Sequence, residues 1–160
     1  MTESSQEPAW LHGHAHEPNP SPPSDDAALL LRLPDGSSQR LTVAELTQLP
    51  RTEVDECYIV STGHGTSGPF RFGGVPLHDL LAAYVPEDVA WQLADVVSGD
   101  GFGNRILRGE TTARARPILL AYAIDGRPLT RAEGLVRLIV PSETDDALRQ
   151  VKWIAEIRLA

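Results

Sequence analysis

The stretch RPILLAYAIDGRPL, residues 116–129, places the strongest constraint on how this chain can fold. An unbroken apolar run leads into Asp125–Gly126, a dipeptide that favours the tight turn of a β-hairpin, and an extended return follows it. Other apolar runs bounded by turn residues predict further strands, at 28–33, 53–61, 91–102, 134–142 and 151–159. Strands therefore dominate this sequence.

Two short helices interrupt these strands. The first is predicted at 41–49, where Thr42 and Glu45 form the pattern of a capping box and Pro50 ends the helix. The second is predicted at 75–85, with Pro76 in its first turn. Between them, residues 62–74 (TGHGTSGPFRFGG) are typical of a glycine-rich loop. The order of elements favours a mixed α+β domain over a regular alternation of strands and helices.

The first 26 residues differ in composition from the rest. They are rich in Pro, Ser and His and contain five acidic and no basic residues, so they carry −5 of the net charge of −8. Such a segment buries too little apolar surface to offset its ordering entropy, which predicts a disordered arm at 1–26 and one domain at 27–160. Its alternating histidines bind metal adventitiously at most: His12, His14 and His16.

Charge and hydrophobicity exclude several classes of partner. The acidic balance argues against nucleic acid, whose phosphates favour basic surfaces. No apolar run approaches the roughly 20 residues needed to span a bilayer, and the start lacks the basic and apolar regions of a secretion signal. We therefore expect a soluble, cytoplasmic protein with no membrane partner. The single cysteine, Cys57, excludes an internal disulfide and an all-cysteine zinc site.

Three blocks in the same order resemble the molybdopterin-binding domain of the sulfite oxidase family. FGGVPLHDLL (72–81) is similar to the family's aromatic-x-Gly-x-x-Leu-x-x-Leu-Leu block. ILLAYAIDGRPLTRAEGLVRLIVP (118–141) is similar to its Leu-Leu-Ala-Tyr-x-x-Asn-Gly-x-Pro-Leu block with the Arg-Leu-x-x-Pro that follows. RQVKWIAEI (149–157) is similar to its closing Arg/Lys-x-Val-Lys-Trp-x-x-x-Ile. The resemblance covers residues 27–160.

The resemblance implies the sulfite oxidase fold and a pocket for a pterin dithiolene with a phosphate tail. In catalytic members a cysteine thiolate ligates molybdenum, and oxygen-atom transfer occurs at that metal. That cysteine precedes the aromatic-x-Gly block by about ten residues, which leads here to Thr62, or to Val60 with a two-residue insertion. Cys57 stands an odd number of residues from both, so a regular strand turns it to the opposite face. We expect it to be a small buried apolar residue and not a metal ligand.

Other positions match the family unevenly. A tyrosine often present near the metal corresponds here to Phe102, which lacks the hydroxyl donor. Arg149 and Lys152 match basic residues that can contact the pterin phosphate. The alternative for Lys152 is a solvent-facing place on an edge strand.

The remaining candidates surround the expected pterin pocket. Thr62, Gly63 and His64 occupy the place where relatives flank the metal, and the glycines around them allow a ligand to approach the backbone. His78 either contacts a pterin group or is simply a polar residue in one turn of a helix. Two further cations stand near these residues without a spacing rule that selects them, Arg71 and Arg105.

Two functions remain open. The first is an oxygen-atom-transfer oxidoreductase of the molybdenum-cofactor family, weakly active or inactive because the cysteine ligand is missing. The second is a non-catalytic module on the same fold that binds a ligand or a protein. If active, the domain needs a redox partner protein, because no haem-attachment pattern and no haem or flavin domain is present. A hydrolytic site at His64 with Ser61 or Thr62 lacks an acid placed to orient the histidine.

Overall fold

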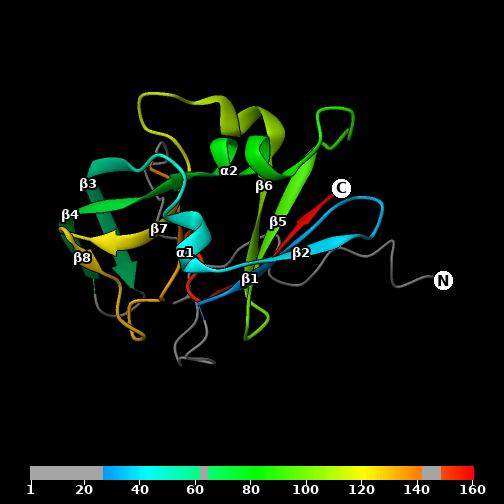
Figure 1. Ribbon diagram of the computed structural model, residues 1–160. Coiled ribbons are helices and arrows are strands. Elements are labelled where there is room, and N and C mark those ends of the chain that lie inside the picture. Colours follow the sequence, from blue (N-terminus) through cyan, green and yellow to red (C-terminus); the bar gives the residue numbers. More distant parts are fainter. Residues whose placement is uncertain (1–26, 62–64, 142–148) are drawn as a thin grey trace.

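Strands in two sheets make up most of the regular secondary structure. A computed structural model describes residues 27–61, 65–141 and 149–160. The first sheet has the order β2-β1-β10-β5-β6 and the second the order β3-β4-β7-β8, with β9 paired to β7 (Figure 1). The strands are β1 (Leu29–Arg32), β2 (Ser38–Leu41), β3 (Thr52–Ser61), β4 (Gly65–Pro76), β5 (Leu93–Ser98), β6 (Gly103–Leu107), β7 (Leu119–Ile124), β8 (Arg127–Pro128), β9 (Arg137–Ile139) and β10 (Ile154–Leu159).

The first sheet joins the two ends of the described chain. Strand β1 pairs in parallel with β10, with Leu31 opposite Ile157, while β2, β5 and β6 pair antiparallel with their neighbours. In the second sheet every pairing is antiparallel. The mixed sheets with few short helices confirm the predicted α+β class.

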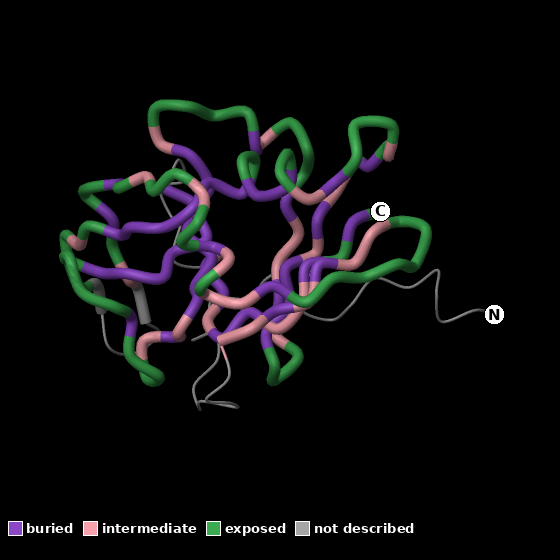
Figure 2. Tube along the Cα trace, viewed as in Figure 1, coloured by how far each residue is buried: buried purple, intermediate pink, exposed green. Residues whose placement is uncertain are grey.

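Two apolar clusters hold the sheets together. The larger cluster combines β1, β5, β10 and helix α2 (Leu77–Tyr84), and the smaller lies on the second sheet around Phe72 and Ile139. Figure 2 shows buried backbone along the strands of both sheets and exposed backbone at most peripheral loops. The burial of these strands therefore accounts for the length of their apolar runs.

The helices form largely where the sequence predicts them. In α1 (Val43–Leu46), the Glu45 amide donates to Thr42 Oγ1 at 3.3 Å, and the Thr42 amide donates to Glu45 Oε1 at 3.1 Å, which confirms the capping box. Helix α2 begins directly after Pro76 and buries Leu77, Leu80 and Leu81. A 3-10 helix not predicted from the sequence, η2 (Arg108–Thr112), follows β6.

The prediction of a glycine-rich loop at 62–74 was wrong for most of its length, because β4 begins at Gly65. Glycine is needed here for close packing between strands. At Gly74 a Cβ atom would lie 2.0 Å from the Leu120 carbonyl oxygen of β7, so only glycine allows the two strands to approach at this register shift.

The predicted strand at 151–159 begins later than expected. Strand β10 starts at Ile154, after Trp153 with a φ of 52°, and its register with β5 shifts between Ile154 and Glu156. This irregularity turns Ile154 into the core, although strict alternation places it on the polar side. Two strands at polar stretches, β2 and β6, were not predicted at all.

In the described ranges, no helix is long and apolar enough to cross a membrane.

Candidate functional site

The sole cysteine is enclosed in the smaller apolar cluster. Cys57 has no exposed surface, and its Sγ lies 3.6 Å from the carbonyl oxygens of Val54 and Asp55. Phe72, Leu119 and Ile139 belong to the same cluster. The structure thus places Cys57 where the sequence predicts it, among apolar side chains.

A β-bulge explains how this burial arises. From Val54 to Cys57, β3 has one residue more than the paired segment of β4, and Glu56 there has a φ of 57°. Val54 and Cys57 therefore both face the core although they are three residues apart. From Cys57 to Ile59 the extra residue belongs to β4, so the bulge does not alter the spacing between Cys57 and the end of β3.

Thr62, Gly63 and His64 lie outside the described residues. Their predicted contact with a cofactor stays a prediction.

Residues 149–153 connect both sheets, and we call them the 149–153 segment. The Gln150 side chain donates to the Tyr58 carbonyl oxygen of β3 at 3.0 Å. The Trp153 carbonyl oxygen accepts from the Gly99 amide in the β5–β6 turn at 3.1 Å, and the Trp153 amide donates to the Gly134 carbonyl oxygen. The segment thereby draws together residues from β3, the β5–β6 turn and the loop before β9.

Lys152 lies against the loop before β9. Its ammonium nitrogen is 4.7 Å from the centre of the Trp153 ring, within the range of a cation–π contact. Its side chain runs over Gly134, where a Cβ would lie 2.9 Å from Lys152 Cβ. Lys152 is half-buried, and it precedes β10 and does not lie on an edge strand, which removes that alternative.

Arg149 points away from Lys152, toward η2. Its Nη1 donates to Glu110 Oε1 at 2.6 Å and its Nη2 to the Arg105 carbonyl oxygen at 2.9 Å. Despite partial burial, the pKa of Glu110 is lowered, because hydrogen bonds from Arg149 and the Leu107 amide favour the carboxylate. The structure therefore engages Arg149 in an internal ion pair.

Phe102 lies in the β5–β6 turn. Its amide donates to Asp100 Oδ1 at 3.0 Å, its carbonyl oxygen accepts from the Ser98 amide, and its ring packs partly against the larger apolar cluster. The same turn is bonded to Trp153, so the position that matches the family tyrosine lies next to the 149–153 segment.

A buried arginine forms the polar centre of this region, and the sequence analysis did not select it. Arg137 on β9 is only 5% exposed, and its Nε and Nη2 donate to Gln150 Oε1 at 2.9 and 2.6 Å. Its Nη1 donates to the Glu133 carbonyl oxygen at 3.1 Å. Burial lowers the pKa of Arg137 to about 10, which leaves the guanidinium protonated at neutral pH.

Among the described residues this cation is hydrogen-bonded only to neutral groups, although the charge of Glu133 opposes the lowering of its pKa. In the part of the chain that the structure describes, no carboxylate is within ion-pair distance of Arg137. A buried charge with only neutral partners is costly, and an anion nearby would reduce that cost. The signal in the sequence was a single arginine inside an apolar strand, GLVRLIV, at residues 134–140.

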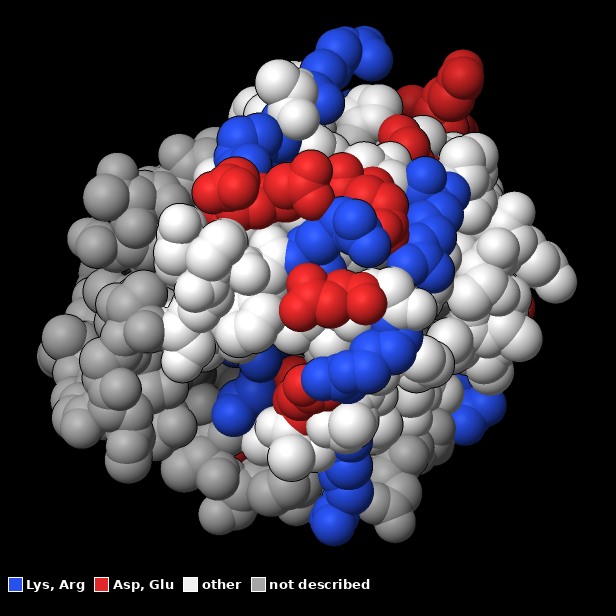
Figure 3. All heavy atoms as spheres, turned by 90° about the vertical axis from the view of Figure 1, so that its left-hand side faces the viewer, with Lys and Arg blue, Asp and Glu red and all other residues white. Residues whose placement is uncertain are grey.

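The two remaining cations are used elsewhere. Arg105 lies on β6, where its Nε and Nη2 donate to the two carboxylate oxygens of Asp95 at 2.8 and 3.0 Å. Arg71 lies on β4 and its Nε is 3.1 Å from Glu53, which also pairs with Arg51. Figure 3 shows the face that carries β3, β4 and β8, on which acidic and basic side chains alternate. Both arginines are thus held by carboxylates.

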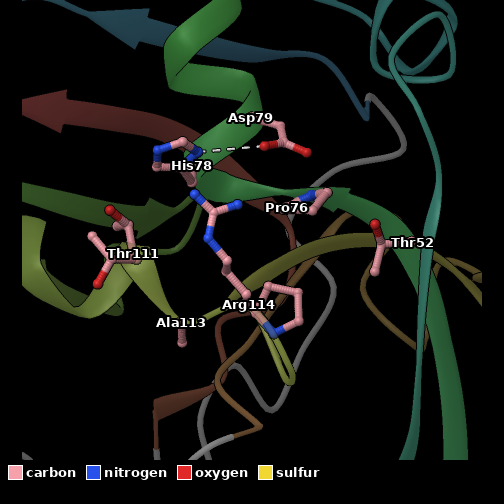
Figure 4. A pocket seen from close by; sticks show the side chains of 9 residues that line it. Thr52, Pro76, His78, Asp79, Thr111, Ala113 and Arg114 are labelled. Carbon is pink, nitrogen blue, oxygen red and sulfur yellow. Dashed lines mark hydrogen bonds and ion pairs between the residues drawn. The ribbon is translucent and has the colours of Figure 1, made fainter.

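His78 is separated from the 149–153 segment. It is exposed at the start of α2, and its Nδ1 lies 3.4 Å from Asp79 Oδ1. It lines the cavity of about 260 Å³ that Figure 4 shows, and also an adjoining cavity of about 480 Å³. Figure 1 places α2 toward the top of the molecule and the orange segment that follows β8 toward the bottom. Gly134, in the segment after β8, contacts Lys152. The structure does not bring His78 together with Lys152.

The side chains present suit one part of the expected cofactor and not another. The buried Arg137 and the ammonium of Lys152 suit an organic phosphate. A metal bound through a thiolate needs an accessible cysteine, and the only thiol is enclosed. Among the described residues, no three His, Cys, Asp or Glu side chains are grouped as metal ligands. The donor set therefore fits the pterin phosphate and does not fit cysteine-ligated molybdenum.

Comparison with known proteins agrees with this fold. Residues 27–160 match the model of the oxidoreductase molybdopterin binding domain. A solved structure of the sulfane dehydrogenase SoxCD from Paracoccus pantotrophus is similar, with a TM-score of 0.66 and 21% identity over 86% of this chain and 38% of that one. The chain thus spans well under half of that structure, and no match was found among curated proteins. On the family match, this chain belongs to the oxidoreductase molybdopterin binding domain family.

Proposed function

We propose that this domain binds molybdopterin through its phosphate end without a cysteine ligand for molybdenum, and is weakly active or inactive in oxygen-atom transfer. One contrast carries the proposal. The sole thiol, on Cys57, is fully enclosed in an apolar cluster, whereas the buried cation of Arg137 has, within the described part of the chain, only neutral hydrogen-bond partners. The domain thus offers charge for an anion and no thiolate for a metal.

The residues that support anion binding come from two parts of the chain, 133–137 and 150–153. Arg137 is fixed by Gln150 and Glu133, and Lys152 is supported by Gly134 and Trp153. Bound molybdopterin supplies a dithiolene that holds molybdenum for oxygen-atom transfer. The part that this chain plays is to hold the phosphate: Lys152 acts as a point charge, and Arg137 lowers the energy of a negative charge nearby.

The alternative is a non-catalytic ligand- or protein-binding module on the same fold. It is favoured by the engagement of Arg149 with Glu110, because this removes one of the cations expected to contact the phosphate. Phe102 supports it as well, since its ring offers no hydroxyl donor. If the domain is active, we expect it to exchange electrons with a partner protein. A cytoplasmic location remains a prediction.

The test is a separate measurement of pterin and molybdenum. The full chain is purified from cells that make the cofactor. Pterin is quantified by fluorescence after oxidative release, and molybdenum by elemental analysis. Pterin in a fixed ratio to protein with little molybdenum supports the proposal. Stoichiometric molybdenum contradicts the proposal that the metal ligand is missing. In that case Cys57→Ala shows whether the Cys57 thiol holds the metal. If the purified chain contains no pterin and no molybdenum, the result favours the alternative module.

A further inference from the structure

A cleft between α2 and η2 is not used by the proposed function. Its two cavities share His78, Thr111 and Thr112, so they form one continuous hollow that we call the α2–η2 cleft. Together the cavities fall in the size range of small-molecule sites. Arg149 contacts η2 through Glu110, whereas Thr111 and Thr112 of the same element line the cleft.

One end of the cleft is polar. Thr52, Thr111 and Thr112 line it together with His78 and Arg114. The hydroxyls of Thr111 and Thr112 already donate to the Arg108 and Gly109 carbonyl oxygens, at 2.6 and 2.8 Å. Figure 4 shows the guanidinium of Arg114 extending up the cavity wall toward the start of α2. The guanidinium of Arg114 is therefore the main hydrogen-bond donor that this end offers to a ligand.

Arg114 is the uncompensated charge at this end. Across the described ranges it has no hydrogen bond and no ion pair, and its side chain is exposed. The carboxylate of Asp79, which also lines the cavity, has its own contact 3.4 Å away at His78 Nδ1, which is an ion pair only when that ring is protonated. A free planar guanidinium is suited to a two-point bond with a carboxylate, sulfonate or phosphate.

The other end of the cleft is mainly apolar. Its wall includes Leu81 of α2 and Val85, the C-cap of that helix. Val89 and Trp91 of the following loop also line it. Arg108 stacks 4.8 Å from the centre of the Trp91 ring and donates to the Trp91 carbonyl oxygen, which holds the indole in place. An apolar body about the size of one aromatic ring would gain burial here.

We propose that the α2–η2 cleft binds a small amphipathic organic anion, with its acidic group on Arg114 and its apolar body toward Trp91. The site is independent of the pterin proposal, since it uses neither Arg137 nor Lys152. The polar and apolar ends adjoin, so a single ligand of modest length can contact both.

Two probes of matched shape and opposite charge test this site on the full chain. The probes are 4-phenylbutyrate and 4-phenylbutylamine, followed by calorimetry and by the NMR signal of the Trp91 indole N–H. We expect the acid to bind and to shift that signal, and the amine to bind at least about tenfold more weakly. Equal binding of the two probes, a shift confined to other residues, or no binding of either at millimolar concentration overturns the proposal.

Variants locate the binding within the cleft. Arg114→Gln is expected to weaken binding of the acid about tenfold or more. Arg127→Gln removes an equally exposed arginine that pairs with Glu133 on the second sheet, and should leave the affinity unchanged. Ala82→Phe, at an exposed helix position that lines the apolar end, should also weaken binding by filling it. An Arg114→Gln protein that melts normally and binds as before overturns the proposal.

Discussion

Gln150 Oε1 accepts two hydrogen bonds from the buried guanidinium of Arg137, at 2.9 and 2.6 Å, while its amide nitrogen donates to the Tyr58 carbonyl oxygen. One fully buried amide therefore ties β9 to β3 and satisfies two donors of a buried cation. This arrangement holds Arg137 in one orientation before any ligand arrives. It makes Gln150 a positioning residue for the proposed phosphate site.

Gln150→Ala should destabilise the domain by about 1 to 3 kcal/mol, because it leaves two donors of a buried charged group unsatisfied. Urea unfolding followed by circular dichroism measures the change. Gln39→Ala, at an exposed position on β2, is the matched control and should cost less than about 0.5 kcal/mol. Equal effects of the two substitutions would mean that the buried network contributes little to stability.

Gly134→Ala should cost more stability than Gly36→Ala. Both glycines have positive φ, 115° and 91°, so both substitutions carry a backbone penalty of about 1 to 2 kcal/mol. At Gly36 an added Cβ meets nothing within 4 Å, whereas at Gly134 it lies 2.9 Å from Lys152 Cβ. We expect a further loss of about 1 to 3 kcal/mol at Gly134 from this contact. Similar melting temperatures for the two variants would contradict it.

Stability should fall in acid partly through Glu133. Hydrogen bonds from Arg127 lower the pKa of Glu133 from 4.5 to about 2. A carboxylate whose pKa is lower in the folded state stabilises it above the unfolded pKa, and this contribution is lost as the pH falls from about 4.5 to 2. Relative to Glu133→Gln, the wild-type chain should therefore lose stability across that range, as measured by urea unfolding at several pH values. Parallel pH profiles of the two proteins would exclude the Glu133 carboxylate as a source of the loss of stability in acid.

The Cys57 thiol should not react in the folded protein. It is fully enclosed, and thiol chemistry requires access to the thiolate. Dithionitrobenzoate should label no thiol under native conditions and one per chain in guanidinium chloride, as read by absorbance. Prompt labelling of the native protein would show that the apolar cluster opens, and would restore Cys57 as a candidate metal ligand.

Lys152→Ala should weaken phosphate binding about tenfold, because the ammonium is a point charge for the anion. Calorimetry with inorganic phosphate measures the effect. Lys152→Met keeps the packing over Gly134 and Trp153 but not the charge, so it should weaken binding equally. Arg158→Ala, an exposed cation on β10, is the control. Unchanged affinity in both Lys152 variants would remove this residue from the site.

Much of the fold could be predicted because its information is local. The Asp125–Gly126 turn, the Thr42–Glu45 capping box and the start of α2 after Pro76 each depend on residues close in sequence. The loop predicted at 62–74 failed because glycine is ambiguous. In β4 the absence of a side chain at Gly74 serves close strand packing, which only the partner strand β7 reveals.

The candidate site was predicted only in part, for a related reason. Lys152 and Phe102 were selected from the sequence, and hydrogen bonds through Trp153 draw their segments together. Arg137 was missed, because an arginine in an apolar run gives no indication of its partner, and Gln150 lies 13 residues further along the chain. For His78 the sequence left open a pterin contact or a polar position in a helix; the structure places it at the exposed start of α2 beside the α2–η2 cleft, and its pterin contact stays a prediction.

The sequence by itself determined the family, the strand-rich class and the absence of a second cysteine, since these depend on residue order and composition alone. The tertiary structure decided which charges are engaged: Arg149 with Glu110, Arg105 with Asp95, and Arg137 through hydrogen bonds to the Gln150 side chain and the Glu133 carbonyl oxygen. The physical reason is that an ion pair or a buried cation depends on distances between segments far apart in the chain. Those distances are set by how the two sheets pack.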